Sequence, residues 1–133
     1  MSPGMPAIVK RTVLVVDDIP SVRFYHQYIL EKSGYRYVVA RDGSEALQKL
    51  QAEPVDLVLL DIVMPNLTGL EFIQQVRSNP AFAQLPILVI STERIGDKVR
   101  RERTAAAGPV GYAQKPLFPE IISAEIRRLL ETT

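Results

Sequence analysis

The sequence lacks cysteine and has a single histidine. A disulfide framework, a thiol nucleophile and a cysteine-ligated metal site are therefore excluded, and the composition is consistent with the reducing cytoplasm. Lys and Arg number 16 against 15 Asp and Glu, a formal net charge of +1 that provides no overall field to attract nucleic acid or an anionic membrane. No apolar run is long enough to span a bilayer, and no secretory signal is present. We expect a cytoplasmic protein without direct nucleic-acid binding or membrane insertion.

The length of 133 residues is typical of one domain. Residues 1–11 contain two prolines and a glycine, which predicts a flexible N-terminal tail. Residues 12–133 are expected to form the domain. Because the chain ends soon after its last helical pattern, the expectation is that no output domain follows.

Short apolar segments alternate with helical patterns along the chain. The predicted strands are Val13–Val16, Tyr35–Ala40, Val55–Leu60, Leu85–Ile90 and Val110–Ala113. The predicted helices start at Pro20, near Ser44, at Thr68 in a capping box with Glu71, near Gly96 or Asp97, and at Pro119. The first helix is expected to turn Val22, Tyr25 and Ile29 toward the core. This alternation predicts an α/β fold with a doubly wound parallel sheet covered by helices on both faces.

Polar residues follow several of the predicted strands. They are Asp17 and Asp18 after the first strand, Asp61 after the third, Ser91 and Thr92 after the fourth, and Lys115 after the fifth. Ligands of such sheets bind beyond the carboxyl ends of the strands, where these residues would meet. Three carboxylates repel one another unless a cation lies among them, and oxygen ligands without cysteine favour Mg²⁺ over zinc. A carboxylate beside such an ion can act as a nucleophile on phosphorus.

Four segments of the chain resemble the receiver domain of bacterial two-component response regulators. They are VLVVDD at 13–18, DIVMPNLTG at 61–69, PILVIS at 86–91 and GYAQKP at 111–116. The resemblance extends from about Thr12 to Glu131. It implies a flavodoxin-like (βα)5 fold with strand order 2-1-3-4-5.

The resemblance also implies a role for each strand-end residue. Asp61 would accept a phosphoryl group from a sensor histidine kinase or a phosphotransfer protein. Mg²⁺ would be held by Asp17, Asp18, Asp61 and the backbone carbonyl of Val63. The roles of switch hydroxyl, switch aromatic and phosphoryl charge partner would fall to Ser91, Tyr112 and Lys115. Thr92 stands where relatives often carry a smaller residue, and it is expected to crowd the phosphoryl group.

The resemblance further implies how the domain signals. A downstream protein, or a second copy in a phosphorylation-dependent homodimer, would bind the surface of the fourth helix, fifth strand and fifth helix. Arg100, Arg101 and Arg103 belong either to that surface or to an ordinary solvated face. Because Val63 cannot position water by hydrogen bonding, self-dephosphorylation is expected to be slow. Beyond this self-catalysed chemistry no enzyme activity is expected.

Other interpretations of the same residues remain open. Asp17 and Asp18 could simply cap the following helix. The domain could be an interaction module that works without phosphorylation. An aspartate-nucleophile phosphatase of the haloacid dehalogenase type is disfavoured, because Ile19 occupies the position that its second acid would require. His26 lies at helical spacing from Val22 and Ile29, which predicts a packed side chain and not a phosphodonor.

Overall fold

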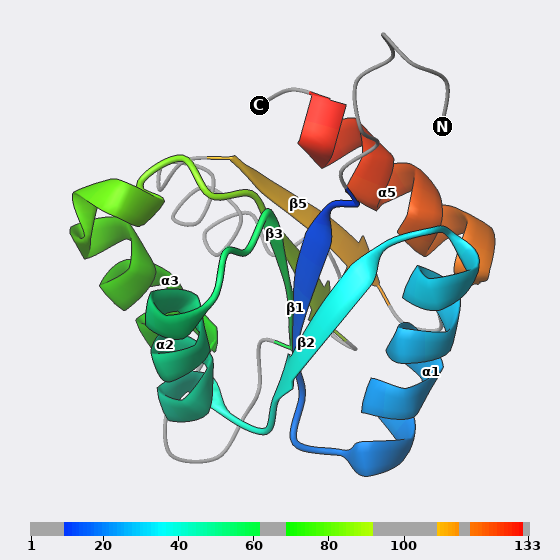
Figure 1. The fold of residues 1–133 in the computed structure, drawn as a ribbon, viewed down its shortest axis with the longest axis horizontal. Helices are drawn as coiled ribbons and strands as arrows, with labels where there is room; N and C mark the ends of the chain where they lie inside the picture. The colour runs from blue at the N-terminus through cyan, green and yellow to red at the C-terminus, as the bar shows by residue number, and fades with distance from the viewer. Residues whose placement is uncertain (1–9, 62–68, 92–108, 115–117, 132–133) are drawn as a thin grey trace, which may run out of the picture.

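The computed structural model describes residues 10–61, 69–91, 109–114 and 118–131 (Figure 1). Its five strands form one parallel sheet in the order β2-β1-β3-β4-β5. The strands are β1 (Thr12–Val16), β2 (Arg36–Ala40), β3 (Leu57–Asp61), β4 (Ile87–Ser91) and β5 (Val110–Gln114). The predicted parallel sheet and its flavodoxin-like strand order are confirmed.

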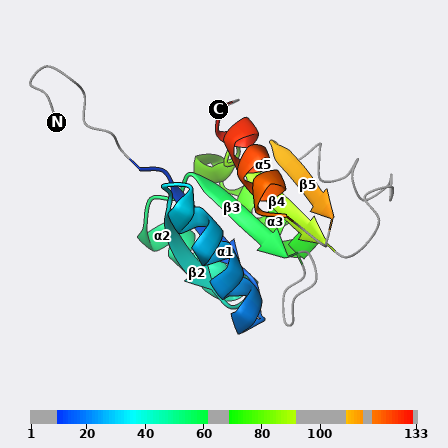
Figure 2. The same ribbon diagram turned by 90° about the vertical axis from the view of Figure 1, so that its right-hand side faces the viewer.

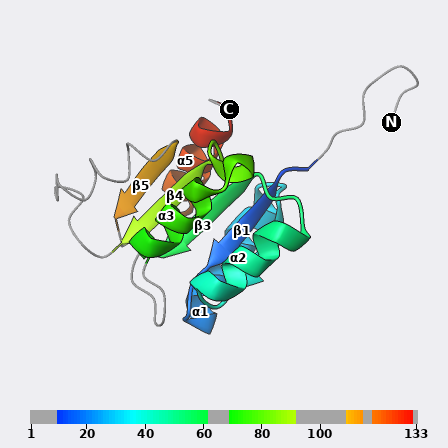
Figure 3. The ribbon, with the colours of Figure 1, turned by 90° about the vertical axis from the view of Figure 1, so that its left-hand side faces the viewer.

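Helices cover both faces of this sheet. They are α1 (Pro20–Lys32), α2 (Gly43–Ala52), α3 (Gly69–Ser78) and α5 (Pro119–Glu131), with a short 3-10 helix, η1 (Pro80–Phe82). Figure 2 shows α1 and α5 on one face, and Figure 3 shows α2 and α3 on the other. The helix expected near Gly96 or Asp97 and most of the expected N-terminal tail lie outside the described residues. No helix in the described part of the chain is long and apolar enough to cross a membrane.

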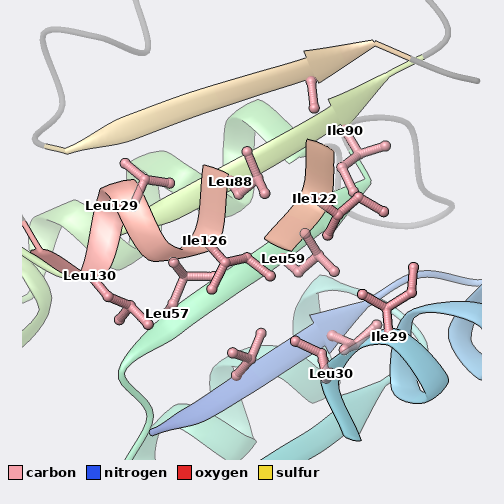
Figure 4. Close-up of a cluster of buried hydrophobic side chains, with 13 residues drawn as sticks. Ile29, Leu30, Leu57, Leu59, Leu88, Ile90, Ile122, Ile126, Leu129 and Leu130 are labelled. Carbon is pink, nitrogen blue, oxygen red and sulfur yellow. The ribbon is translucent and has the colours of Figure 1, made fainter. Parts of the chain in front are cut away.

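Each face of the sheet has its own hydrophobic core. Leu14 and Val16 point toward α2 and α3, where they share one core with Phe72 and Ile73 of α3. The intervening residues of β1 pack toward α1 and α5, where Ile126 and its neighbours fill the opposite core (Figure 4). Successive side chains of a strand point to opposite faces, so a strand between two helical layers must be apolar throughout. This explains the continuous apolar runs of the sequence.

Helix α1 is rotated relative to its predicted orientation. Its buried residues are His26, Ile29 and Leu30, whereas Tyr25 is 39% exposed. The prediction that Tyr25 faces the core was wrong, because the apolar stripe is one residue further along and includes the histidine. His26 is packed as expected, with its ring 5.7 Å from that of Tyr25. The predicted stop at Gly34 is confirmed, since its positive φ of 85° follows the helix.

Several element boundaries differ from the predicted ones by one or two residues. α2 begins at Gly43, because the carboxylate of Asp42 caps it by accepting the N–H of Glu45 at 2.9 Å. β3 and β4 each begin two residues later than predicted, at Leu57 and Ile87. Before β4, Pro86 has no N–H to donate to a ladder.

Arg77 ties three segments together at the end of α3. Its guanidinium donates to the carbonyls of Phe82 at 2.8 Å, Leu85 at 2.6 Å and Pro109 at 3.1 Å. Burial lowers the pKa of Arg77 from its ordinary value. Sequence patterns did not reveal this contact, because three carbonyls brought together by folding leave no local signature.

Candidate functional site

The register of the sheet aligns the strand ends that carry the acids. Val16 of β1 pairs with Leu60 of β3, so Asp17 and Asp61 occupy the next positions on adjacent strands. Asp61 in turn pairs with Ile90 of β4, directly before Ser91. All strands are parallel, and their carboxyl ends therefore meet at one edge. We call this edge, with Asp17, Asp18, Asp61 and Ser91, the acidic edge.

Asp17 is held in place by main-chain and side-chain hydrogen bonds. Its N–H donates to the carbonyl of Ala40 at the end of β2 (3.1 Å), and its carboxylate accepts the N–H of Ile19 (3.0 Å). Its own carbonyl accepts a hydrogen bond from the guanidinium of Arg23 (2.8 Å). The residue is only 2% exposed, whereas the neighbouring Asp18 is exposed to solvent. Asp17 is thus held within the packed protein, whereas the side chain of Asp18 is accessible to solvent.

Helix capping does not account for these two acids. The N-cap of α1 is Ile19, which makes no side-chain cap hydrogen bond, and Pro20 occupies the first turn. The Asp17 carboxylate accepts the N–H of the cap residue itself, which precedes the helix. A capping side chain would instead bond an N–H inside the first turn. Through this bond Asp17 stabilises the loop after β1.

The structure places only some of the other predicted site residues. Asp61 and Ser91, which were expected just after the third and fourth strands, are the last residues of β3 and β4. The backbone of Tyr112 within β5 pairs with Val89. Val63, Thr92 and Lys115 lie outside the described residues, as does the arginine cluster at 100–103. The roles assigned to all these side chains stay predictions.

The residue types at the acidic edge fit a hard divalent cation. Asp17 and Asp18 supply carboxylate oxygens beside the end of β3, where Asp61 stands. The sole histidine, His26, is buried on α1 within the packed helix face. Among the side chains that the structure describes, which do not include that of Asp61, no group of three or more His, Cys, Asp or Glu could hold a metal. The donor set therefore matches Mg²⁺ provided that Asp61 contributes the third carboxylate.

The family model of the response regulator receiver domain matches residues 13–127. The chain belongs to this family. Receiver domains are signalling domains of two-component systems and not classical enzymes. They bind Mg²⁺ in their active site and interact with histidine kinases and downstream targets.

Individual relatives of this receiver domain agree with that assignment. The alkaline phosphatase synthesis transcriptional regulatory protein PhoP of Bacillus subtilis is 34% identical over 120 residues, which cover 90% of this chain and 48% of PhoP. The chain spans about half the length of the curated relatives that it matches across most of its own length. The chemotaxis response regulator CheY4 of Vibrio cholerae is 35% identical and superimposes with a TM-score of 0.84, over 91% of this chain and 99% of CheY4.

A more distant structure shares the fold. The receiver domain of the sensor histidine kinase PA1611 from Pseudomonas aeruginosa is 23% identical, with a TM-score of 0.81 over 92% of this chain and 99% of that domain. Its crystal structure has a magnesium ion coordinated in the active site cleft.

Sequence reasoning missed one residue that touches the acidic edge, Arg23. The motif directed attention to side chains that immediately follow strands, whereas Arg23 lies inside α1 and reaches back to the loop. A signal was present in the sequence, because a cation in the first turns of a helix is unfavourable there.

Proposed function

We propose that this receiver domain accepts a phosphoryl group on Asp61 in a Mg²⁺-dependent reaction and signals by altered protein binding. The observation that carries the proposal is the register that sets Asp61 beside the buried Asp17 and the exposed Asp18. The donor would be a phosphohistidine on a sensor histidine kinase or a phosphotransfer protein. The expected cytoplasmic location is part of the proposal.

The transfer requires one bond to form and one to break. A carboxylate oxygen of Asp61 attacks phosphorus, the phosphorus–nitrogen bond to the donor histidine breaks, and the released imidazole takes a proton from solvent. A bound Mg²⁺ would offset negative charge on the phosphoryl oxygens. Asp17, Asp18, Asp61 and the carbonyl of Val63 would hold this ion.

Other residues would stabilise and read the phosphoryl group. Lys115 would pair with its charge and Ser91 would donate a hydrogen bond to one of its oxygens. Tyr112, as the switch aromatic, would move together with Ser91. Thr92 would limit access to the phosphoryl group. Slow self-dephosphorylation remains the expectation from Val63, and a phosphoryl lifetime of only seconds would contradict it.

The output surface would include β5 and α5. Phe118 and Ile121, at the start of α5, are 63% and 47% exposed, which suits a surface that a protein partner covers. A downstream protein is the proposed partner, and a homodimer formed on phosphorylation would use the same surface.

The decisive experiment is incubation with acetyl phosphate, with and without Mg²⁺, followed by intact-mass measurement. The unsubstituted chain should gain the mass of one phosphoryl group only with Mg²⁺, and Asp61→Ala should gain none, because the nucleophile is gone. Asp56→Ala is the matched control. Asp56 lies before β3, at the opposite end of the same strand, where its carboxylate accepts the N–H of Thr12 at 2.7 Å.

The alternative outcomes are distinguishable. An adduct that persists in Asp61→Ala would place the phosphoacceptor elsewhere. No adduct with acetyl phosphate or with a histidine kinase would favour the phosphorylation-independent interaction module.

A further inference from the structure

Arg23 binds the loop that carries the first two acids of the acidic edge. It is half-buried on α1, and its guanidinium donates to the main-chain carbonyl of Asp17 at 2.8 Å. The same residue's N–H donates to the carbonyl of Ile19 at 3.0 Å, as the first helical turn requires. Both contacts fix α1 to the loop between Val16 and Pro20.

The hydrogen bond to Asp17 constrains the orientation of Asp18. The carbonyl of Asp17 and the nitrogen of Asp18 belong to one planar peptide, so fixing the oxygen fixes the plane from which Asp18 begins. The preceding N–H of Asp17 is already bound to the carbonyl of Ala40. Asp17 is thus held on both sides of its Cα, and Asp18 leaves it in a defined direction even though its side chain is exposed.

Helix stability does not explain a cation at this position. Arg23 is the fourth residue of α1, and the first turn contains no acid. The N-terminal end of a helix carries partial positive charge, so an arginine there lowers helix stability instead of raising it. The contact with Asp17 gives the residue a function that the helix itself does not.

The hydrogen bond from Arg23 is made to the main chain of the acid-bearing loop. Arg23 donates to a main-chain oxygen and not, in this bond, to a carboxylate. A guanidinium paired with the Asp17 carboxylate would compete with a metal ion for its oxygens. Donation to the carbonyl instead orients the loop without occupying a carboxylate oxygen.

We propose that Arg23 is a positioning residue for the Mg²⁺ site, holding the Asp17–Asp18 peptide so that both carboxylates face the ion. This inference rests on the proposed function. The charge of Arg23 alone predicts the opposite effect, because a cation near the site should repel Mg²⁺. Removing Arg23 weakens Mg²⁺ binding if the residue positions ligands, and strengthens binding if only its charge matters.

The experiment measures the Mg²⁺ dissociation constant of the full chain by calorimetry. Loss of residues that orient metal ligands typically weakens binding about tenfold or more, so Arg23→Ala should raise the Kd by about tenfold. Arg23→Lys keeps the charge but has a single donor nitrogen. Its Kd should lie between those of the unsubstituted chain and Arg23→Ala. Melting temperatures in EDTA are measured in parallel, because a merely structural role would lower these and leave the Kd unchanged.

Arg41→Ala is the matched control for charge. Arg41 follows the end of β2 at the same edge of the sheet, and its side chain pairs with Glu45 at 3.0 Å. Arg41→Ala removes the same charge without altering the loop between Val16 and Pro20. The Kd for Mg²⁺ should stay the same or fall slightly.

Each result has a defined meaning. A Kd of Arg23→Ala equal to or below that of the unsubstituted chain would overturn the positioning role. If Arg23→Ala does not fold, Arg23→Lys decides: a raised Kd at unchanged melting temperature supports the role, and an unchanged Kd overturns it. Absence of both Mg²⁺ binding and a phosphoryl adduct in the unsubstituted chain would instead overturn the proposed function, and this inference with it.

Discussion

Gly111 shows how a single missing side chain sets the distance between β5 and α5. A Cβ at this position would lie 2.9 Å from Cδ1 of Leu129, 3.2 Å from Nη2 of Arg128 and 3.3 Å from Cδ1 of Leu88. Contacts below about 3 Å force the neighbours to move. The helix therefore packs against the strand at a distance that only glycine permits without rearrangement.

We predict that Gly111→Ala lowers the free energy of unfolding by about 1–2 kcal/mol, through overpacking. Urea denaturation followed by circular dichroism measures this value. The substitution should cost less in a Leu129→Ala background, where the contact at 2.9 Å is removed. An equal cost in both backgrounds would show that the strain has another origin.

At the scale of single residues, the sequence predicted which acids stand at the strand ends better than it predicted the packing. Asp17, Asp18 and Asp61 could be identified because each directly follows or ends an apolar strand. The close packing around Gly111 and the hydrogen bond of Arg23 to Asp17 could not be identified in this way. They depend on distances between segments far apart or on a side chain that folds back onto a loop.

Among the helices, α2 has a well-defined side-chain cap that the sequence analysis did not identify. The cap is Asp42, which lies two residues before Ser44, and its carboxylate accepts the N–H of Glu45. Both residue types are common caps, so the sequence alone could not choose between them. The extended backbone of Asp42 and its hydrogen bond to Glu45 identify it as the cap.

Asp42→Ala should therefore destabilise the protein by about 1 kcal/mol, whereas Ser44→Ala should change stability little. The reason is that alanine at position 42 leaves the N–H of Glu45 without its acceptor, while Ser44 lies exposed inside the first turn. Thermal denaturation of both variants measures the difference. Equal effects of the two substitutions would contradict the assignment of Asp42 as the cap.

The orientation of α1 illustrates the limit of helical periodicity. Tyr25 and His26 are adjacent, and a shift of one residue decides which of them enters the core. The pattern placed both rings at helical spacing from Val22 and Ile29. In the structure Ile29 and Leu30 pack against the sheet, and only His26 is buried with them. Tertiary packing therefore set a choice that local pattern left open.

At the scale of the whole molecule, the two hydrophobic cores share a single sheet. Phe72 is buried in the core beneath α2 and α3, and Ile126 in the core beneath α1 and α5. Neither side chain is more than 1% exposed. Since every strand of the sheet between them contributes to at least one core, neither layer should remain folded without the other.

We predict that Phe72→Ala and Ile126→Ala each destabilise the protein by about 2–5 kcal/mol and leave one cooperative unfolding transition. Amide hydrogen exchange tests this prediction. Both substitutions should raise exchange in helices on both faces of the sheet. Faster exchange confined to the substituted face would show that the layers unfold independently.

The overall topology could be predicted because strand and helix patterns alternate regularly, which restricts a parallel sheet to few arrangements. The relative placement of side chains at the acidic edge depends on the register as well. Apolar runs of similar length do not encode a register, which here follows from the packing of residues such as Leu14 and Leu60 into one core.

The strand order also leaves β2 at a border of the sheet, with only β1 beside it among the described strands. Its sequence, RYVVA, is strongly β-forming, and an unpaired strand of this kind can recruit the same strand of another molecule. Arg36 is the only charged residue of this strand, and it is exposed. Charged side chains on a border strand disfavour such pairing, so we expect Arg36 to oppose self-association of the protein through β2.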